Sequence, residues 1–444
     1  MPDRPNVLYL HAHDTGRHLQ PYGYAVPTFH LQRLADQGTL YRNAFCISPT
    51  CSPSRAALLT GQYPHQCGQL GLSNAGYPLR HPERHWVHAF NAAGYATALM
   101  GVQHVTADER DLPFGYVRPE IVGYAFGRAE EAAHAESVAD ATCGWLREHG
   151  KGGPWMLDAG TLQTHTASWA LLGDDELPSE RAVDVARVPA LLADSPEARA
   201  WYARHIVIAG ILDRAVGRIL HTLDELGLAD NTLVLFTVDH GLGLPTAKCN
   251  LTDAGLEAAL ILRGPGFVGG RTVHESVTHL DVFPTLCELC GLDRPAWLEG
   301  TSLLGDPPHH PATFAQTNVH GSPIPARSVR TDRYKLIRRW HTPDVLAHNT
   351  DARPPKQRMT DHGWPHRFPP GRPVDAHATD VLFDLELDPT ERHDRSIDPA
   401  YAKPYADLTQ RLAEWTARTN DQIPNADDPI ALLADMSDRS VKER

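Results

Sequence analysis

Short apolar runs alternate with longer amphipathic stretches over roughly the first 300 residues of the chain. Continuous apolar runs of about four to eight residues, bounded by polar or turn residues, predict buried strands. Apolar positions that recur every three to four residues predict helices instead. This alternation predicts an α/β fold, with a mainly parallel sheet sandwiched by helices. We expect strands over 6–10, 95–100, 155–160, 231–238 and 258–262, and helices over 30–37, 86–93, 136–148 and 197–226.

Polar clusters follow four of the predicted strands, at residues 11–14, 103–104, 163–165 and 239–240. The carboxyl ends of parallel strands meet at one edge of a sheet, and the ligands of such sheets bind there. We therefore expect the four clusters to converge on one functional site. A single His carries little weight in this argument, because the chain contains 26 histidines.

The character of the sequence changes after Gly305, where stretches rich in Pro and His begin. Two short strands around a turn at 331–333, a strand over 381–387 and a terminal helix over 405–416 are expected in this part. The Pro-, His- and Gly-rich stretch 341–379 is expected to be a long irregular excursion that shapes the substrate pocket. We therefore predict an α/β domain over residues 1–305 and a smaller α+β subdomain, with a small antiparallel sheet, over residues 306–444.

The composition narrows the function classes. The chain has 444 residues, of which 42% are hydrophobic and 21% charged, as in a globular protein. Lys and Arg number 41 against 54 Asp and Glu, and the resulting net charge of −13 disfavours general nucleic-acid binding. No apolar stretch approaches the ~18 residues of a membrane-spanning helix, and the first residues lack a signal-peptide pattern. The seven cysteines are too few for a disulfide framework. We expect a cytoplasmic protein with no nucleic-acid or membrane partner.

The strongest local signal is the sequence PTCSPSRAALLTG at residues 49–61. Pro53 and Gly61 fit the first turn and the end of a short helix. Cys51 then lies at the helix N-terminus, where free N–H groups and the helix dipole favour an anion, and Arg55 lies one turn along on the same face. A buried Cys beside a solvated Arg is the alternative, and the spacing by itself does not separate the two.

This stretch resembles the sulfatase signature, Cys-x-Pro-Ser-Arg followed by an apolar pair and Thr-Gly. The resemblance implies an alkaline-phosphatase-like sulfatase fold. It also implies that a formylglycine-generating enzyme oxidises Cys51 to formylglycine, whose hydrated aldehyde is the nucleophile. Residues 51–56, residues 59–61 and the spacing from Asp239 to Lys248 are most similar to the sulfamidase (heparan N-sulfatase) branch. Further segments in the sulfatase order are the pair His13-Asp14 and residues 41–45, 237–241, 327–336 and 382–389.

The resemblance also implies one divalent metal ion. His13-Asp14 and Asp239-His240 follow two strands, and together with residue 51 they would supply oxygen and imidazole donors. Either pair taken by itself fits a capping or hydrogen-bonding role better than a metal site, and only the two pairs together with the signature favour the metal. The family uses Ca²⁺, whereas two imidazoles favour Mn²⁺ or Zn²⁺. His13 stands where the family has a carboxylate.

Three further residues match positions that contact the sulfate or the leaving group in sulfatases, namely His104, His165 and Lys248. Without the motif, His104 would be interpreted as a loop residue and Lys248 as a surface residue. The family has a lysine two residues before the histidine that matches His104, and this chain has Val102 at that position. The pocket therefore lacks one cation, and Gln103 offers a neutral hydrogen bond as a replacement.

The resemblance implies hydrolysis of a sulfate ester or sulfamate in a small anionic substrate. One hydroxyl of the hydrated aldehyde would attack sulfur, His165 or Lys248 would protonate the leaving group, and His104 would deprotonate the second hydroxyl. One alternative is a phosphonate monoester or phosphodiester hydrolase of the same superfamily, whose substrates also carry one negative charge. Another is a non-catalytic anion-binding protein in which Cys51 stays a thiol. The CxxC pair Cys287 and Cys290 is expected to lie in the core.

Overall fold

An eight-stranded sheet forms the centre of the computed structural model, which describes residues 4–118, 128–165, 188–190, 194, 196–244, 247–340 and 379–442. The strand order is β4-β3-β5-β1-β6-β7-β2-β8. All neighbours are parallel except β7, which runs antiparallel to both β6 and β2. This confirms the predicted mainly parallel sheet. The strands are β1 (Asn6–Ala12), β2 (Thr39–Phe45), β3 (Ala96–Gly101), β4 (Tyr116–Val117), β5 (Trp155–Gly160), β6 (Thr232–Val238), β7 (Leu260–Arg263) and β8 (Arg271–Thr278).

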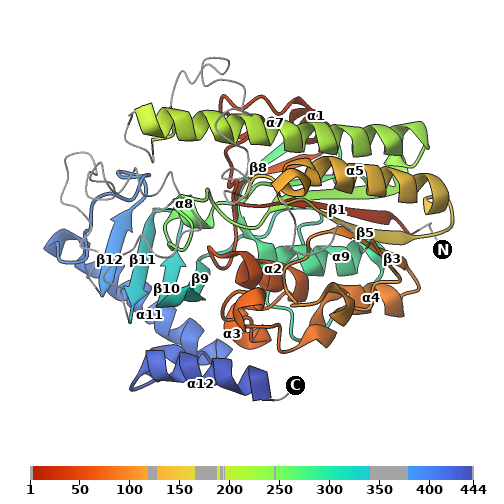
Figure 1. The fold of residues 1–444 in the computed structure, drawn as a ribbon. Helices are drawn as coiled ribbons and strands as arrows, with labels where there is room; N and C mark the ends of the chain where they lie inside the picture. Colours follow the sequence, from red (N-terminus) through yellow and green to blue (C-terminus); the bar gives the residue numbers. More distant parts are fainter. Residues whose placement is uncertain are drawn as a thin grey trace.

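Helices cover both faces of this sheet (Figure 1). One face carries α1 (Phe29–Gln37), α5 (Arg128–His149) and α7 (Pro196–Glu225), and the other carries α2 (Cys51–Thr60), α4 (Trp86–Ala92) and α9 (Val282–Cys290). Each face has its own hydrophobic core. The strand interiors are therefore buried on both sides, which explains the continuous apolar runs in the sequence. No described helix has the length and apolar character needed to cross a lipid bilayer. Two short helices, α3 (Pro64–Cys67) and α8 (Asp253–Leu256), lie in the connections.

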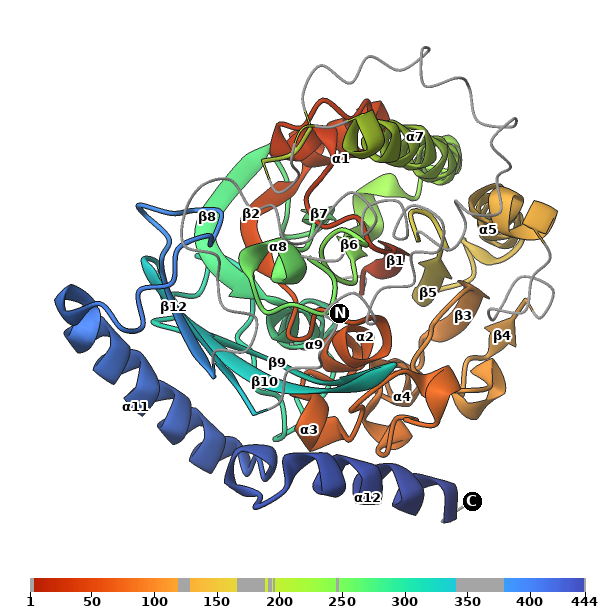
Figure 2. The same ribbon diagram turned by 60° about the vertical axis from the view of Figure 1, so that its left-hand side comes forward.

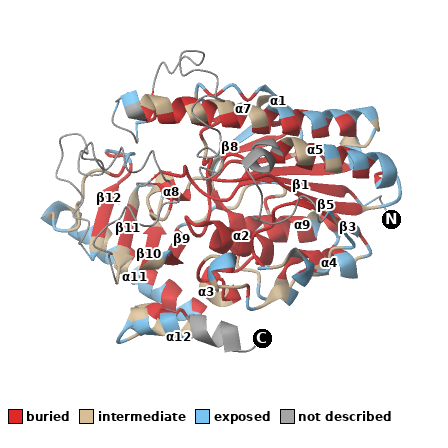
Figure 3. Ribbon diagram, in the orientation of Figure 1, coloured by how far each residue is buried: buried red, intermediate tan, exposed pale blue. Residues whose placement is uncertain are grey.

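Burial follows this layering (Figure 3). The outer faces of α5 and α7 are exposed, whereas all ten residues of α2 are buried. A helix that is buried on every side cannot have been recognised by amphipathic periodicity. Cys287 and Cys290 lie on α9 and are buried, as predicted.

A second, four-stranded antiparallel sheet follows, with the order β12-β11-β10-β9 (Figure 2). The predicted pair of strands around 331–333 is confirmed by β10 and β11. Helix α11 packs on these two strands. Its end is held by a buried ion pair, in which Arg327 Nε lies 2.5 Å from Asp421 Oδ2. The elements of this part are β9 (Thr313–His320), β10 (Ser322–Arg330), β11 (Tyr334–Arg339), β12 (Asp380–Asp384), α11 (Ala402–Thr419) and α12 (Pro429–Lys442).

The structure corrects several details of this second part. The helix expected over 405–416 is longer and is not terminal, because α12 follows it. The strand expected over 381–387 ends at Asp384. Strand β9 was missed because buried polar residues stand inside it. One of them, Thr317, donates from Oγ1 to the carbonyl oxygen of Ile324 on the neighbouring strand at 2.6 Å. The excursion 341–379 lies outside the described residues except for its last position, and the domain division at residue 305 stays a prediction.

Candidate active site

The loops that follow β1, β3, β5 and β6 converge with the N-terminus of α2 at one edge of the large sheet (Figure 2). His13 and Asp14 come directly after β1, and Asp239 and His240 come directly after β6. These two strands are neighbours, with Ala12 opposite Val238. Adjacent parallel strands therefore bring both polar pairs to the same place, as the sequence predicted.

Four potential metal ligands meet there. One donor atom from each of His13, Asp14, Cys51 and Asp239 lies within 4.8 Å of the others, and all four residues are buried. His13 Nδ1 lies 3.0 Å from Asp239 Oδ2. The fifth predicted ligand, His240, joins the group, with Nε2 at 3.3 Å from Asp14 Oδ1 and 3.4 Å from Cys51 Sγ.

This donor set fits a divalent cation. Two ligands held at ~2.0–2.6 Å from one ion lie at most about 5 Å apart, which agrees with the observed spread of donor atoms. Burial and the charge of Arg55 hold the pKa of His13 well below its ordinary value, so its imidazole is neutral, the form that binds metals. Burial by itself would raise the pKa of Asp239, but His240, Arg55 and His13 hold it well below its ordinary value. Asp239 is therefore a carboxylate.

The backbone around the donors is held in place. Asp14 has a φ of 48°, in the left-handed region that non-glycine residues seldom occupy. Its N–H donates to Asp239 Oδ1 at 3.0 Å, and the N–H of His240 donates to the same oxygen at 3.0 Å. The Asp239 carboxylate thus links the ends of β1 and β6 and orients the residues on both.

Cys51 is the first residue of α2, as predicted, and it is 1% exposed. The free N–H groups and the dipole at this helix end favour negative charge beside its side chain. Ser54, in the first turn, donates from Oγ to the carbonyl oxygen of Asp239 at 2.5 Å and ties the helix to the end of β6. Residue 51 is therefore fixed against the donor cluster.

Arg55 lies one turn further along and is 2% exposed, so the solvated arginine of the alternative interpretation is wrong. Its Nη2 donates to Ala12 O at 2.9 Å and pairs with Asp239 Oδ2 at 3.2 Å. Its Nη1 donates to Nδ1 of His11 at 2.5 Å. The guanidinium thus places a permanent positive charge beside residue 51.

Sequence analysis missed a buried pair behind Arg55. An arginine only donates, so Nδ1 of His11 accepts, and its Nε2–H donates to Asp158 Oδ1 at 2.8 Å. Asp158 lies within β5 and is fully buried. The available signal was a charged residue in the middle of the otherwise uncharged strand Trp155–Gly160.

The three remaining predicted residues also lie at this cluster. Lys248 Nζ lies 3.2 and 3.1 Å from the two carboxylate oxygens of Asp14, and Lys248 is 1% exposed, so its surface interpretation is wrong. His165 Nε2 lies 4.0 Å from Asp14 Oδ2. The ring of His104 is centred 6.2 Å from that of His13. The structure therefore brings all nine predicted site residues together.

The loop after β3 carries Val102, at the position where the family resemblance leads us to expect a lysine. Val102 is fully buried, and its N–H donates to Gly160 O at 3.0 Å. The Gln103 side chain is engaged in its own loop, where Oε1 accepts from the N–H of Val105 at 2.6 Å and Nε2 donates to Thr106 Oγ1 at 2.5 Å. The Gln103 amide is therefore committed to the loop, which leaves Val102 without a polar substitute from its neighbour.

Comparison with known proteins identifies the family. Residues 5–292 match the Sulfatase family. The chain is 26% identical to the human N-sulphoglucosamine sulphohydrolase over 500 aligned residues, covering 96% of this chain and 92% of that protein.

Two solved structures share the fold. One is a protein in complex with its substrate D-glucosamine-2-N,6-O-disulfate, with a TM-score of 0.72, 16% identity and coverage of 96% of this chain and 100% of that chain. The other is the phosphonate monoester hydrolase of Agrobacterium radiobacter, with a TM-score of 0.67, 21% identity and coverage of 94% and 97%. The signature at Cys51, its place in the fold and the match over residues 5–292 lead to one conclusion: the chain belongs to the sulfatase family of hydrolases.

Proposed function

We propose that this protein hydrolyses a sulfate ester or sulfamate of a small sulfated sugar, with residue 51 as the nucleophile after its conversion to formylglycine. The observation that carries the proposal is the position of Cys51, at the N-terminus of α2 with its Sγ among the donor atoms of His13, Asp14 and Asp239. The sugar is supported by the human relative, named for N-sulphoglucosamine, and by the neighbour solved with a sulfated glucosamine.

His13, Asp14, Asp239 and His240 would hold the divalent cation together with residue 51. A cation bound there supplies positive charge that lowers the cost of negative charge on the attacking oxygen and on the sulfate. The two carboxylates balance the charges of Arg55 and Lys248, so the bound cation would make the site net positive. Ca²⁺ follows from the family, and the imidazole donors keep Mn²⁺ and Zn²⁺ as candidates.

The residues around position 51 have separate tasks. A hydrated formylglycine supplies two hydroxyl groups, one for displacement at sulfur and one for the later release of sulfate. Arg55 forms an ion pair with Asp239 and keeps its own positive charge beside residue 51. His165 or Lys248, both next to Asp14, gives a proton to the leaving oxygen or nitrogen as its bond to sulfur breaks.

His104 serves the release step. It takes the proton of the remaining hydroxyl, so that the C=O bond of the aldehyde forms again and sulfate departs. Burial and Arg55 hold the pKa of His104 well below its ordinary value, so the ring is neutral and able to accept that proton. The products are sulfate and the free alcohol or amine.

Hydrolysis of a phosphonate monoester or phosphodiester is the second candidate function. The buried Val102 favours it to the same degree as sulfate ester hydrolysis, because both substrates carry one negative charge at the reacting group. A substrate panel of an aryl sulfate, a sulfated glucosamine, a sulfamate and an aryl phosphonate monoester separates the two functions. The proposal fails if the matured enzyme prefers the phosphonate.

The nucleophile is tested by co-expression with a formylglycine-generating enzyme. Mass spectrometry of the peptide that contains residue 51 reports its conversion. Cys51→Ala should abolish turnover while circular dichroism and the unfolding temperature stay close to those of the parent protein. A residue 51 that stays a thiol under these conditions, or a Cys51→Ala variant that keeps more than a few per cent of activity, contradicts the mechanism.

A further inference from the structure

The loop that follows β3 holds His104 in a backbone conformation that residues other than glycine seldom adopt. The φ of His104 is 59°, in the left-handed region. In a residue with a side chain this conformation costs free energy, and it persists only where the surrounding structure holds it. The ring of His104 is centred 6.2 Å from that of His13, so the same backbone conformation decides where the ring lies relative to the metal donors.

The side chain of Gln103 braces this turn. Its Oε1 accepts from the N–H of Val105 at 2.6 Å and from that of Thr106 at 3.2 Å. Its Nε2 donates to Thr106 Oγ1 at 2.5 Å. All three bonds join Gln103 to the two residues that follow His104. The side chain is buried, so bulk water does not compete for these bonds. The carboxamide therefore closes a short loop around His104.

The two N–H groups bound by Gln103 belong to buried residues. Because Val105 and Thr106 are both buried, each N–H group needs an acceptor inside the protein. A side-chain oxygen that accepts from N–H groups a few residues further on is the arrangement with which Asn and Asp stabilise turns. Thr106 Oγ1 extends the brace by donating to the carbonyl oxygen of Asp108 at 2.8 Å. Removing the carboxamide would take the acceptor from two buried donors and favour a different turn at His104.

The rest of the loop is anchored to the sheet and to α2. The N–H of Val102 donates to the carbonyl oxygen of Gly160 at 3.0 Å, at the end of β5. Ser73 Oγ donates to the carbonyl oxygen of His104 at 3.5 Å. The N–H of Ser73 donates in turn to the Oγ of Ser52, the second residue of α2, at 3.1 Å. These contacts fix where the loop lies, and Gln103 fixes the turn within it.

We propose that Gln103 is a positioning residue for the release step and acts through His104, whose ring it holds in place. In that step the proton of the remaining hydroxyl moves to His104, and its oxygen forms the C=O bond again. The bond from the same carbon to the sulfate oxygen breaks, and the electron pair leaves on sulfate. Gln103 itself makes and breaks no covalent bond. The inference rests on the proposed function and names a residue that its release step requires.

Rapid-mixing kinetics of the matured enzyme on an aryl sulfate tests the proposal. Gln103→Met keeps the length of the side chain and removes the amide. We expect kcat to fall about tenfold to a hundredfold, because a misplaced general base loses part of the 10²–10⁴-fold that such groups contribute. The value of kcat/KM should stay within about twofold, because it reports on the first displacement. The initial burst of aryl alcohol should grow toward one per active site, because release is then the slow step. A parallel fall in kcat and kcat/KM without a burst overturns the proposal.

A conservative variant and a matched control assign the effect to the brace. Gln103→Asn has a shorter carboxamide that accepts from the same N–H groups in an Asx turn, and it should keep kcat within about threefold of the parent value. Gln316→Met also removes a buried glutamine, whose Oε1 lies 2.5 Å from His65 Nδ1 beside the second sheet, and it should leave kcat and the burst unchanged. A Gln103→Asn variant that behaves like Gln103→Met, or an enlarged burst in Gln316→Met, overturns the proposal.

Circular dichroism and the unfolding temperature check that Gln103→Met folds. If it does not fold, Thr106→Val takes its place, because it removes the group that receives the Nε2 bond and leaves the two N–H bonds of Gln103 intact. Its kcat should fall about threefold and its burst should grow, with kcat/KM unchanged. A Thr106→Val protein with the kinetics of the parent would reject the role of Gln103.

Crystal structures of the parent and of Gln103→Met, both with Cys51 unconverted, separate this inference from the proposed function. In the variant, His104 should leave the left-handed region and its ring should move by about 1 Å or more relative to His13, a shift that is costly for catalysis. An unmoved His104 overturns the inference whatever the kinetics. A moved ring in a protein without turnover of any sulfate or phosphonate supports the positioning and rejects the proposed function. Turnover that Gln103→Met leaves unchanged supports the proposed function and rejects the role of Gln103.

Discussion

His11 and Asp158 form a buried pair in the middle of the large sheet, with His11 Nε2 at 2.8 Å from Asp158 Oδ1. Asp158 sets which ring nitrogen of His11 carries the proton, and the other nitrogen then accepts from Arg55 at 2.5 Å. A residue outside the donor cluster therefore orients the guanidinium beside residue 51. Such supporting partners typically change activity by about 10–100-fold when they are removed.

We expect Asp158→Asn to lower kcat by about 10–100-fold with a smaller change in KM, because the amide can turn an N–H toward His11 and disturb the bond to Arg55. Steady-state kinetics on a sulfated glucosamine checks this. Met156→Leu, a buried apolar change on the same strand, is the matched control and should keep kcat within about twofold. Equal kcat values for the parent and Asp158→Asn would show that the pair has only a structural role.

Metal removal should abolish activity and lower the unfolding temperature. A ligand that binds only the folded state stabilises it by about 2.7 kcal/mol at one hundred times its dissociation constant, so thermal unfolding with and without a chelator measures the site. Asp239→Asn should lose the metal in elemental analysis, whereas Asp36→Asn, an exposed change on α1, should keep it. Adding back Ca²⁺, Mn²⁺ or Zn²⁺ identifies the ion. Full activity in chelator would contradict a metal site at these residues.

The active site has Val102 where the family has a lysine, and it should therefore favour substrates with one negative charge at the reacting group. A unit charge at ~4 Å contributes about 4 kcal/mol at an effective dielectric constant near 20, before desolvation is counted. Val102→Lys should therefore raise the ratio of kcat/KM for an aryl phosphate to that for the matched aryl sulfate, by roughly tenfold. Val102→Met, long but uncharged, is the control. A preference for aryl phosphate in the parent enzyme, or an unchanged ratio, would count against the argument.

Glu391 should make stability depend on pH near neutrality. Burial raises its pKa to about 7, and the contact with Lys335 opposes this only in part. Because the folded pKa lies above the unfolded value of ~4.3, the folded state holds the proton longer, and stability falls as pH rises from about 4.5 to 7. Glu391→Gln cannot ionise. The difference in free energy of unfolding, variant minus parent, should therefore rise by about 1–3 kcal/mol as the pH is raised from 5 to 8.

Denaturant unfolding at several pH values measures this difference. Glu386→Gln is the control, because Glu386 is 66% exposed and pairs with Arg333 at the surface. Its stability relative to the parent should be independent of pH over the same range. A Glu391→Gln variant whose relative stability does not change between pH 5 and pH 8 would show that Glu391 ionises normally.

Local patterns determined a large part of this protein. The apolar runs and their periodicity identified most strands of the large sheet and most helices that cover it, because each run forms a buried strand or the buried face of one helix. The residues at Cys51–Arg55 and the polar residues after β1, β3, β5 and β6 identified the site. The carboxyl ends of these parallel strands lie at one edge of the sheet, so the residues that follow them come together there.

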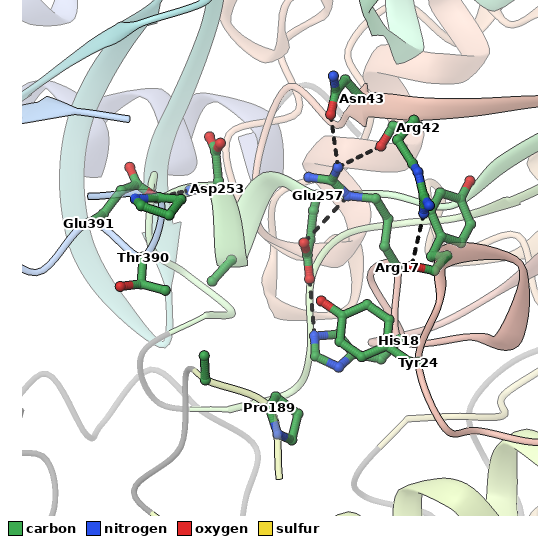
Figure 4. A pocket seen from close by; sticks show the side chains of 14 residues that line it. Arg17, His18, Tyr24, Arg42, Asn43, Pro189, Asp253, Glu257, Thr390 and Glu391 are labelled. Carbon is green, nitrogen blue, oxygen red and sulfur yellow. Dashed lines mark hydrogen bonds and ion pairs between the residues drawn. The ribbon is translucent and has the colours of Figure 1, made fainter. Parts of the chain in front are cut away.

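Only the tertiary structure decided the contacts between segments far apart in the chain. The pair His11–Asp158 joins residues 147 positions apart, and it exists because β1 and β5 are neighbours in a particular register. Arg42 lines a cavity with Glu257 and Glu391 because strand β2, the segment after α8 and the turn after β12 meet there (Figure 4). Buried polar strands such as β9 escape a hydrophobic pattern for the same reason. Some of their polar side chains bond to groups that only the packing brings near, as Thr317 does to the carbonyl oxygen of Ile324, and a local sequence pattern carries no record of those partners.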